Sequence, residues 1–415
     1  MGKTLKGLFN LWQGLKLAIT NSPHQTGFSQ SLRSALFITL KSPQKNHKIK
    51  SSFWTPLNIK IVAVVVTLNL FGLAMVLSAG SVVASQEGLG EFSYFYKQGM
   101  WFSAGLAVLY GFSKFDYRKL QPLVPVLLGI TYFMFFLLFT PLGVEGGGAT
   151  RWLAVPGGTF QPSEMLKLVM ILFTAKHLSE YEKNLNSPRA YRDPILVLVP
   201  AMLLLFSQPD YGTMCLVAFL VAILLFLGGM PLGKFLTIGA GSSLLVIGGA
   251  IAAPYRRQRL LAILDLEGDS LNTGWQTLQS LTGISNGGLL GVGPGASKSK
   301  WWTPETHTDF IFTIIAEEMG LVGSLLVLSL FVAFVVLGVR VAVGASNASD
   351  KFGYLLAMGI TIWFVVQAFV NIGVTIGRLP NTGLPLPFVS YGGSSLLVGM
   401  AAVGILLNIS RQTVK

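Results

Sequence analysis

An aspartate and a cluster of arginines lie directly beside long apolar segments, where charged side chains are unusual. Asp309, in the stretch WWTPETHTDFIF, lies where a polar segment runs into an apolar helical pattern. A carboxylate there is costly to retain, so it either caps a helix or has a chemical task. Arg256, Arg257 and Arg259, in PYRRQR, follow another apolar run. Guanidinium groups donate paired hydrogen bonds to phosphate, so these residues predict pyrophosphate binding or, more simply, anchoring on lipid phosphates.

A second group of polar side chains precedes another apolar run, in GGGATRWLAVPGGTFQPSEMLKL. Arg151 and Trp152 suit the binding of a polar headgroup at a membrane surface, although both residue types also serve there as simple anchors. Ser163, which follows a proline, is placed to cap a helix. Glu164 and Lys167 are three residues apart and can pair on one helix face, in a structural or a catalytic role.

The stretch GRLPNTGLPLPFVSYGGSSLL is the third polar segment. Its prolines and Gly383 prevent a continuous helix, so it is predicted to be irregular backbone at membrane depth, satisfied by protein or by a wet cavity. Arg378 opens this segment. Ser394 and Ser395 begin the next apolar run with small residues that permit close approach of a helix or a ligand.

The residues around Asp309 do not predict a metal site. His307 could orient a substrate, ligate a metal or lie on the surface, and Thr308 separates it from Asp309. One histidine and one aspartate do not form a metal site by spacing, and the sequence has no HExxH motif or cysteine cluster. Glu317 and Glu318 follow deeper in the same apolar pattern, and acids within a span usually face a polar interior.

The elements that position these residues are membrane helices. The chain has 415 residues, of which 52% are hydrophobic and 11% charged, with a mean hydropathy of +0.62. Soluble domains carry about 25% charged residues, so the composition predicts an integral membrane protein. The single cysteine, Cys215, excludes an intramolecular disulfide. The net charge of +13 does not indicate nucleic-acid binding, because the basic residues lie in a tail and in loops between apolar runs.

Ten apolar runs are long enough to cross a bilayer, which predicts an all-α fold of ten transmembrane helices. The predicted spans are 58–84, 95–113, 121–141, 162–181, 193–208, 210–229, 234–254, 308–341, 353–377 and 390–410. Residues 255–307 then form a long polar loop between the seventh and eighth spans. Loops of this length are uncommon in compact folds unless they are functional.

The distribution of basic residues predicts the orientation. Lysines and arginines gather in the short loops on the side of the N-terminus: Lys114, Arg118, Lys119, Lys176, Lys183, Arg189, Arg192, Lys234, Arg340 and Lys351. The short loops of the other side hold only Lys97, Arg151 and Arg378. Both termini are therefore predicted to be cytoplasmic, with the loop 255–307 and Asp309 on the outer face.

Residues 1–55 contain eight lysines or arginines and no acid. They are interpreted as a flexible, basic cytoplasmic tail preceding a membrane domain at 56–412, and the tail can lie on anionic lipid. A transit peptide, which has a similar composition, is the alternative.

Several of these motifs occur together in a known order. LPLPFVSYGGSSLL, ETHTDFIFTIIAEEMG, RWL followed by FQPSEMLKL, QPDYGT and PYRRQR resemble the SEDS family, the FtsW/RodA/SpoVE group of cell-wall proteins. The resemblance covers about residues 58–410. Some FtsW proteins carry a lysine where this chain has Thr382, with Arg378 nearby. The long tail and GVGPGASKSKWW favour an FtsW-like protein of the division septum, whereas NTGLPLPF fits RodA, which acts in cell elongation, equally well.

The resemblance implies a peptidoglycan glycosyltransferase of the plasma membrane that polymerises lipid II into β-1,4 glycan strands at its outer face. It also implies a class B penicillin-binding protein, a transpeptidase, as a partner, together with other division or elongation proteins. The essential aspartate of the family falls on Asp309, and its Arg-Trp pair falls on Arg151 and Trp152.

The chemistry requires few groups. A pyrophosphate leaving group needs charge stabilisation, for which Arg151, Arg256 and Arg259 are the candidates, whereas the acceptor hydroxyl needs a base, which we assign to Asp309. Mg²⁺ or Mn²⁺ could bridge the pyrophosphate, and no organic cofactor is expected. Two alternatives remain. One is a lipid II flippase that uses Glu164, Lys167 and the acids of span eight, and the other is a non-catalytic scaffold.

Overall fold

The computed structural model describes residues 55–413, apart from 147, 157, 185–186 and 304 and the stretch 238–272, where only 239, 241 and 248 are described. The helices are α3 Pro56–Gln86, α4 Ser93–Lys114, η1 Tyr117–Lys119, α5 Leu120–Leu137, α6 Pro162–Glu180, η2 Glu182–Asn184, α7 Arg189–Ser207, α8 Tyr211–Gly228, α11 Thr273–Gly287, η3 Ser299–Trp301, α12 Ile311–Asn347, α13 Lys351–Thr375 and α14 Gly393–Thr413. The strands are β1 Gly143–Gly146, β2 Ala149–Val155 and β3 Gly158–Phe160.

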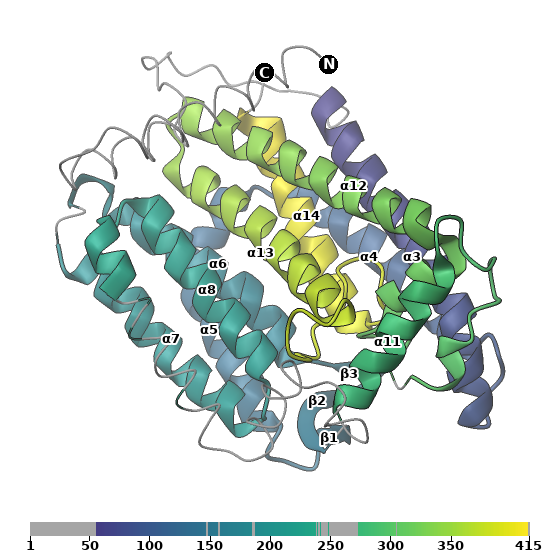
Figure 1. The fold of residues 1–415 in the computed structure, drawn as a ribbon. Helices are drawn as coiled ribbons and strands as arrows, with labels where there is room; N and C mark the ends of the chain where they lie inside the picture. Colours follow the sequence, from purple (N-terminus) through teal and green to yellow (C-terminus); the bar gives the residue numbers. More distant parts are fainter. Residues whose placement is uncertain are drawn as a thin grey trace.

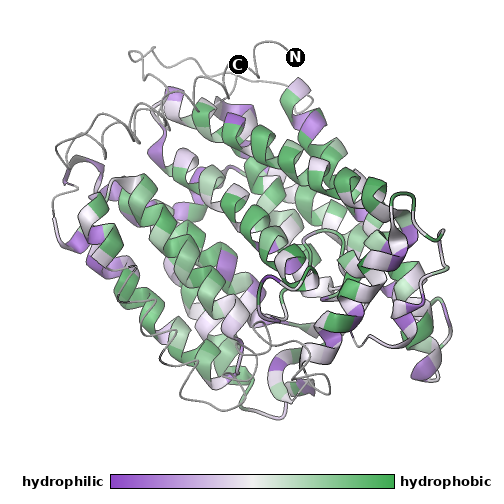
Figure 2. Ribbon diagram, viewed as in Figure 1, coloured by the Kyte–Doolittle hydropathy of each residue, from purple (hydrophilic) through white to green (hydrophobic). Residues whose placement is uncertain are grey.

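The long helices form a bundle with the start of α3 and the end of α14 at one end and the sheet and α11 at the other (Figure 1). Within the described ranges, seven helices are long and apolar enough to cross a membrane: α5 with its leading turn η1, and α3, α7, α8, α12, α13 and α14. Their middles are apolar, and polar residues collect toward the ends of the bundle (Figure 2). The protein is therefore a multi-pass membrane protein, and the predicted helical membrane fold is confirmed. The predicted span 234–254 and the tail 1–54 lie outside the described residues, apart from a few positions at the start of that span.

Short polar motifs start several of the spans. Thr55 caps α3 by accepting a hydrogen bond from the Asn58 amide (3.2 Å), and Pro56 follows in the first turn. Asp210 caps α8 through the Thr213 amide at 3.2 Å. It stands in the tight turn between α7 and α8, at the position where the QPDYG sequence predicts one. Such caps satisfy amides that would otherwise be unpaired at a helix start.

The centre of the bundle is α13 and α14, with α4 packed along α14. Most of α14 is buried within the protein. Small residues allow this close packing. A Cβ at Gly404 would lie 2.6 Å from the Leu109 carbonyl oxygen, and a Cβ at Gly105 would lie 2.9 Å from Met400 Cγ. Helices in membranes approach closely where such residues meet.

Three features differ from the sequence prediction. The loop 255–307 contains the helix α11, which the spacing of Trp275, Leu278, Leu281 and Ile284 could have indicated. The predicted span from residue 308 begins instead at Ile311 and is broken at Gly320, where φ is +63°. A small antiparallel sheet, in the order β1-β2-β3, occupies the connection before α6.

The break in α12 is stabilised by backbone contacts from the segment that follows α11. The amides of Val292 and Gly293 donate to the carbonyls of Glu317 and Glu318, at 2.9 and 3.1 Å. The amides of Leu321 and Val322 donate to Gly288 and Leu289, at 3.0 and 3.2 Å. These bonds satisfy the groups that the break leaves unpaired, so the first two turns of α12 are docked onto α11 as a separate short helix.

Candidate active site at the start of α12

Asp309 lies two residues before α12, in the turn that joins the polar loop to the helix. Its main-chain carbonyl accepts a hydrogen bond from Asn371 Nδ2 of α13 at 2.8 Å, and the same nitrogen donates to the Leu384 carbonyl at 2.8 Å. The Asp309 side chain is half-buried, and its Oδ2 would lie 3.7 Å from a Cβ built on the exposed Gly383. The carboxylate therefore stands at the edge of the protein, beside backbone that carries no side chain.

The irregular segment between α13 and α14 holds this turn from the other side. Ser390 Oγ donates to the Thr308 carbonyl at 2.6 Å, and the Tyr391 amide donates to the His307 carbonyl at 2.9 Å. Gln98 of α4 supports the segment, because its Nε2 donates to the Ser390 carbonyl at 3.3 Å. The predicted irregular backbone is thus confirmed, and protein groups satisfy it as required at membrane depth.

His307 is buried in an aromatic cluster. Its ring centroid lies 4.7 Å from that of Tyr94 and 5.5 Å from that of Tyr391. Burial lowers the pKa of His307 below its usual value, while the nearby carboxylates of Glu305 and Glu87 act in the opposite direction. The neutral ring packs the turn in place. Thr308 Oγ1 donates to Glu305 Oε2 at 2.8 Å.

Ser394 connects this region with the start of α6. Its hydroxyl donates to the Thr159 carbonyl at 3.1 Å and accepts from the Gln161 amide at 3.0 Å. Ser395 is half-buried in the same first turn of α14. The strand β3 and α6 are therefore tied to the helix that follows the Tyr391 segment.

Arg151 fixes the sheet to the turn between α7 and α8. Its Nε donates to the Gln208 carbonyl and its Nη2 to the Pro209 carbonyl, both at 2.9 Å. Trp152 is half-buried and pairs with Val144 across the sheet, with its ring against Gly146. Arg151 therefore joins the sheet to the turn between α7 and α8, and Trp152 packs within the sheet.

Glu164 and Lys167 form the predicted ion pair, at 2.7 Å, and both are buried. Lys167 Nζ also donates to Gln367 Oε1 of α13 at 3.1 Å and lies 5.1 Å from the Trp363 ring centroid. Gln367 Nε2 donates in turn to the Pro385 carbonyl at 2.9 Å. This buried network supports the irregular segment two residues beyond Gly383.

Comparisons with known proteins agree with this arrangement. Residues 59–415 match the family model FTSW_RODA_SPOVE, described as "Cell cycle protein". The chain belongs to the FtsW/RodA/SpoVE family. A "Probable peptidoglycan glycosyltransferase FtsW" of Geobacter sulfurreducens is 38% identical over 86% of this chain and 95% of its own length. Stage V sporulation protein E of Bacillus subtilis is 37% identical over 85% and 97%.

Two solved structures are also similar. One, from "Structural coordination of polymerization and crosslinking by a peptidoglycan synthase complex", has a TM-score of 0.73 and 29% identity, covering 87% of this chain and 100% of that chain. The other is the rod shape determining protein RodA of Thermus thermophilus. Its TM-score is 0.63 at 26% identity, covering 88% and 100%.

The structure divides the predicted site residues into three groups by their location. His307, Thr308 and Asp309 lie together, next to the segment that leads to Ser394 and Ser395. A second group stands apart in supporting contacts: Arg151, Trp152, Ser163, Glu164 and Lys167. Arg378 is exposed in the turn after α13, and Arg256, Arg257 and Arg259 lie outside the described residues.

Ser163 does not cap α6, contrary to the prediction. The helix already begins at Pro162, whose fixed φ suits the first helical position, and Gln161 occupies the cap. The Ser163 hydroxyl instead donates to Asp210 Oδ2 at 3.4 Å. It thereby joins α6 to the start of α8.

The acids of α12 also have supporting contacts. Glu317 accepts hydrogen bonds from the amides of Lys298 and Ser299, at 3.2 and 3.1 Å, and from the Ser297 hydroxyl. Glu318 accepts from the Ser78 hydroxyl of α3 and lies 3.8 Å from Lys300. Both carboxylates hold the polar loop against the bundle.

Three buried side-chain amides that hold the site together were not predicted from the sequence. Gln98, Gln367 and Asn371 are almost fully buried in otherwise apolar helices, and each binds the backbone of the irregular segment. A signal was present, since carboxamides within an apolar span need partners and mark places where non-helical backbone lies alongside.

Proposed function

We propose that this protein is a peptidoglycan glycosyltransferase that polymerises lipid II into β-1,4 glycan strands, with Asp309 as the general base. The observation that carries this proposal is the position of Asp309: a half-buried carboxylate at the lip of a membrane helix, beside the exposed Gly383. Both substrates are lipid-linked, so their sugars must react at the membrane surface. The similar Geobacter sulfurreducens protein, a probable peptidoglycan glycosyltransferase FtsW, supports the same reaction.

The reaction needs one displacement. The Asp309 carboxylate takes the proton of the acceptor 4-hydroxyl as that oxygen attacks the anomeric carbon of the donor. The bond from this carbon to the pyrophosphate oxygen breaks, and the pyrophosphate leaves with the electron pair. Attack opposite the leaving group converts the α-linkage of the donor into the β-linkage of the product. General base catalysis of this kind contributes about 10²- to 10⁴-fold to a rate.

The leaving group needs positive charge, which we assign to Arg256 and Arg259, with the exposed Arg378 as a further candidate. Arg151 uses two of its donors for backbone carbonyls, so its contribution in this proposal is to place the turn between α7 and α8.

A divalent ion, Mg²⁺ or Mn²⁺, would be carried by the substrate. Among the described residues, no group of three or more His, Cys, Asp or Glu side chains could hold a metal ion. Mg²⁺ is commonly held by one or two carboxylates together with substrate phosphates, and Asp309 fits that limited role. When bound, the ion would neutralise charge on the pyrophosphate.

The proposed setting is the outer face of the plasma membrane at the division septum, with both termini in the cytoplasm. Asp309 and the described part of the loop, which includes α11, would then face outward, at the end of the bundle away from the start of α3 and the end of α14 (Figure 1). The family description as a cell cycle protein and the FtsW relatives support a division role. A class B penicillin-binding protein is the proposed partner, and the similar synthase complex supports this pairing.

The test uses purified protein with its transpeptidase partner in detergent, where there are no two membrane sides between which a lipid could be flipped. We expect wild-type protein to form glycan strands from lipid II and Asp309→Asn to form none at an unchanged melting temperature. Glu91→Gln, which removes an exposed acid before α4, is the matched control and should be fully active. Absence of polymer from the wild-type complex would favour the flippase, and growth of cells on Asp309→Asn would favour the scaffold.

A further inference from the structure

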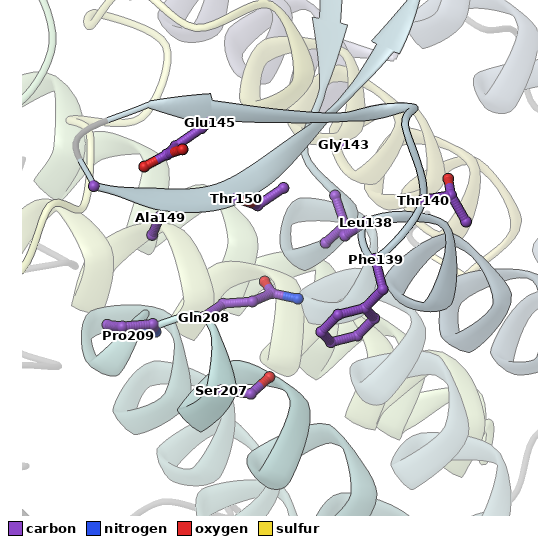
Figure 3. Close-up of a pocket in the computed structure, with 11 residues that line it drawn as sticks. Leu138, Phe139, Thr140, Gly143, Glu145, Ala149, Thr150, Ser207, Gln208 and Pro209 are labelled. Carbon is purple, nitrogen blue, oxygen red and sulfur yellow. The ribbon is translucent and has the colours of Figure 1, made fainter.

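A cavity lies at the outer edge of the bundle, apart from Asp309 and its turn. It has a volume of about 560 Å³ and is formed by the end of α5, the β1–β2 hairpin and the turn between α7 and α8 (Figure 3). Its lining consists of Leu138, Phe139, Thr140, Gly143, Glu145, Gly148, Ala149, Thr150, Ser207, Gln208 and Pro209. Sites for small ligands commonly measure about 300–1,000 Å³.

Gln208 is the polar group that the protein leaves unsatisfied in this lining. The residue is 5% exposed, and its Nε2 has no hydrogen-bond partner within the described residues. In Figure 3 the amide points to the side of the cavity where Leu138 and Phe139 lie. A buried N–H without a partner costs roughly 1–3 kcal/mol. Because Nε2 itself is closed to solvent, a turn of the amide that brings it to a ligand carbonyl in the cavity would be favoured.

The turn that carries Gln208 is rigidly placed. Arg151 binds the main-chain carbonyls of Gln208 and Pro209, and Asp210 caps the next helix. The amide is thus presented from fixed backbone. Placing the donor in advance reduces the entropy that a ligand must lose on binding.

The other side chains that line the cavity indicate which class of ligand it can bind. Glu145 is the one ionisable group among the described lining residues, and Arg151 behind the turn is engaged with the carbonyls of Gln208 and Pro209, so the lining offers a pyrophosphate no cation. Thr140 and Ser207 donate their hydroxyl protons to the carbonyls of Leu137 and Leu204, at 2.6 and 2.7 Å, so toward a ligand their oxygens can only accept, which an acyl chain cannot use. Phe139 is exposed and offers an aromatic face to the C–H groups of a sugar ring. A neutral ligand with hydroxyls and an amide carbonyl fits all of these groups.

We propose that this cavity binds an N-acetylated hexosamine unit of the glycan, with the acetamido carbonyl accepting from Gln208 Nε2 and a ring hydroxyl donating to Glu145. The identity of the strand depends on the proposed function. The start of α8, which follows the turn of Gln208 and Pro209, also packs against the irregular segment, because Gly212 lies against the Thr382 carbonyl, next to Gly383. A strand extending from Asp309 would place a later sugar in this cavity.

The test measures binding of tetra-N-acetylchitotetraose, a soluble β-1,4 oligomer, to the detergent-solubilised full chain by saturation-transfer NMR. We expect signal at the acetyl methyl groups for wild type and Asp309→Asn, and a loss of about fivefold in affinity for Gln208→Met. Gln412→Met makes the same change near the C-terminus, at the opposite end of the bundle, and should bind as wild type. Because Asp309→Asn lacks polymerase activity but keeps this cavity, failure of this proposal is separable from failure of the proposed function.

Gln208→Met should keep its melting temperature, because it removes an unsatisfied donor and leaves the backbone contacts of Arg151 intact. Glu145→Gln, on the exposed hairpin, gives a second variant with weaker sugar binding. Absence of binding by wild type, or equal binding by wild type and Gln208→Met, would overturn the proposal. Displacement of the sugar by pyrophosphate or by a stem pentapeptide would overturn it as well. In the polymerisation assay, Gln208→Met should shorten the product strands.

Discussion

Asp309 and Glu164 are both acids close to a helix start, yet their surroundings differ. Asp309 is half-buried beside the exposed Gly383, and the surrounding turn is held through main-chain groups. Glu164 is 2% exposed and pairs with Lys167 at 2.7 Å inside the bundle. A carboxylate that must take a proton from substrate needs access, whereas one that supports the fold needs a buried partner. We therefore assign catalysis to the turn of Asp309 and support of the fold to the Glu164–Lys167 pair. The following substitutions test that assignment.

Lys167→Met has the largest expected effect on stability. It leaves Glu164 buried without its cation and should lower the free energy of unfolding by about 3–5 kcal/mol. Thermal unfolding in detergent measures this loss. The double variant Lys167→Met with Glu164→Gln should regain part of it, because the unpaired charge is gone. A Lys167→Met protein with wild-type stability and no activity would instead show that Glu164 and Lys167 take part in catalysis.

Glu317→Gln tests whether the acids of α12, like Glu164, support the fold and do not act on substrate. The carboxylate accepts from two amides and one hydroxyl, and the carboxamide would turn a donor toward them. We expect a loss of about 1–3 kcal/mol in unfolding free energy. Activity per folded molecule should stay near wild type. If activity falls while the melting temperature holds, Glu317 acts on substrate.

Gly383→Ala perturbs the other region. The φ of Gly383 is +69°, which costs an L-residue about 1–2 kcal/mol, while the added methyl has room at 3.7 Å from Asp309 Oδ2. The strained backbone should shift beside the carboxylate and lower turnover by roughly tenfold. Gly88→Ala, also at positive φ (+71°) but with open space around it, is the control. Equal effects of both substitutions on turnover would remove Gly383 from the site.

The smallest expected effect is a pH dependence at His307. Burial lowers its pKa in the folded protein below the usual value of 6.5, so the unfolded chain binds the proton more tightly. Stability is therefore complete above pH 6.5 and falls as the pH drops below it. Melting temperatures between pH 8 and pH 5 should decline less for His307→Phe than for wild type. Parallel curves would show that the imidazole does not titrate in this way.

The positions of the spans could be predicted because each is a long apolar run with polar residues at its ends. The location of Asp309 at a helix start followed from the same pattern. The hydrogen bonds that hold the site together could not be predicted. The partners of Arg151 are backbone carbonyls 57 and 58 residues away, and Asn371 meets Asp309 across 62 residues. Main-chain acceptors carry no sequence signal, and the break at Gly320 depends on backbone groups of Gly288, Leu289, Val292 and Gly293, in the segment after α11.

The most direct test of the central claim compares the kinetics of Asp309→Asn and wild type with lipid II, per folded molecule, in the complex with the transpeptidase. If Asp309 is the base, kcat falls by about 10²- to 10⁴-fold while KM and the melting temperature remain unchanged. An Asp309→Asn protein that keeps its kcat, or loses activity only in proportion to its folded fraction, would contradict the account.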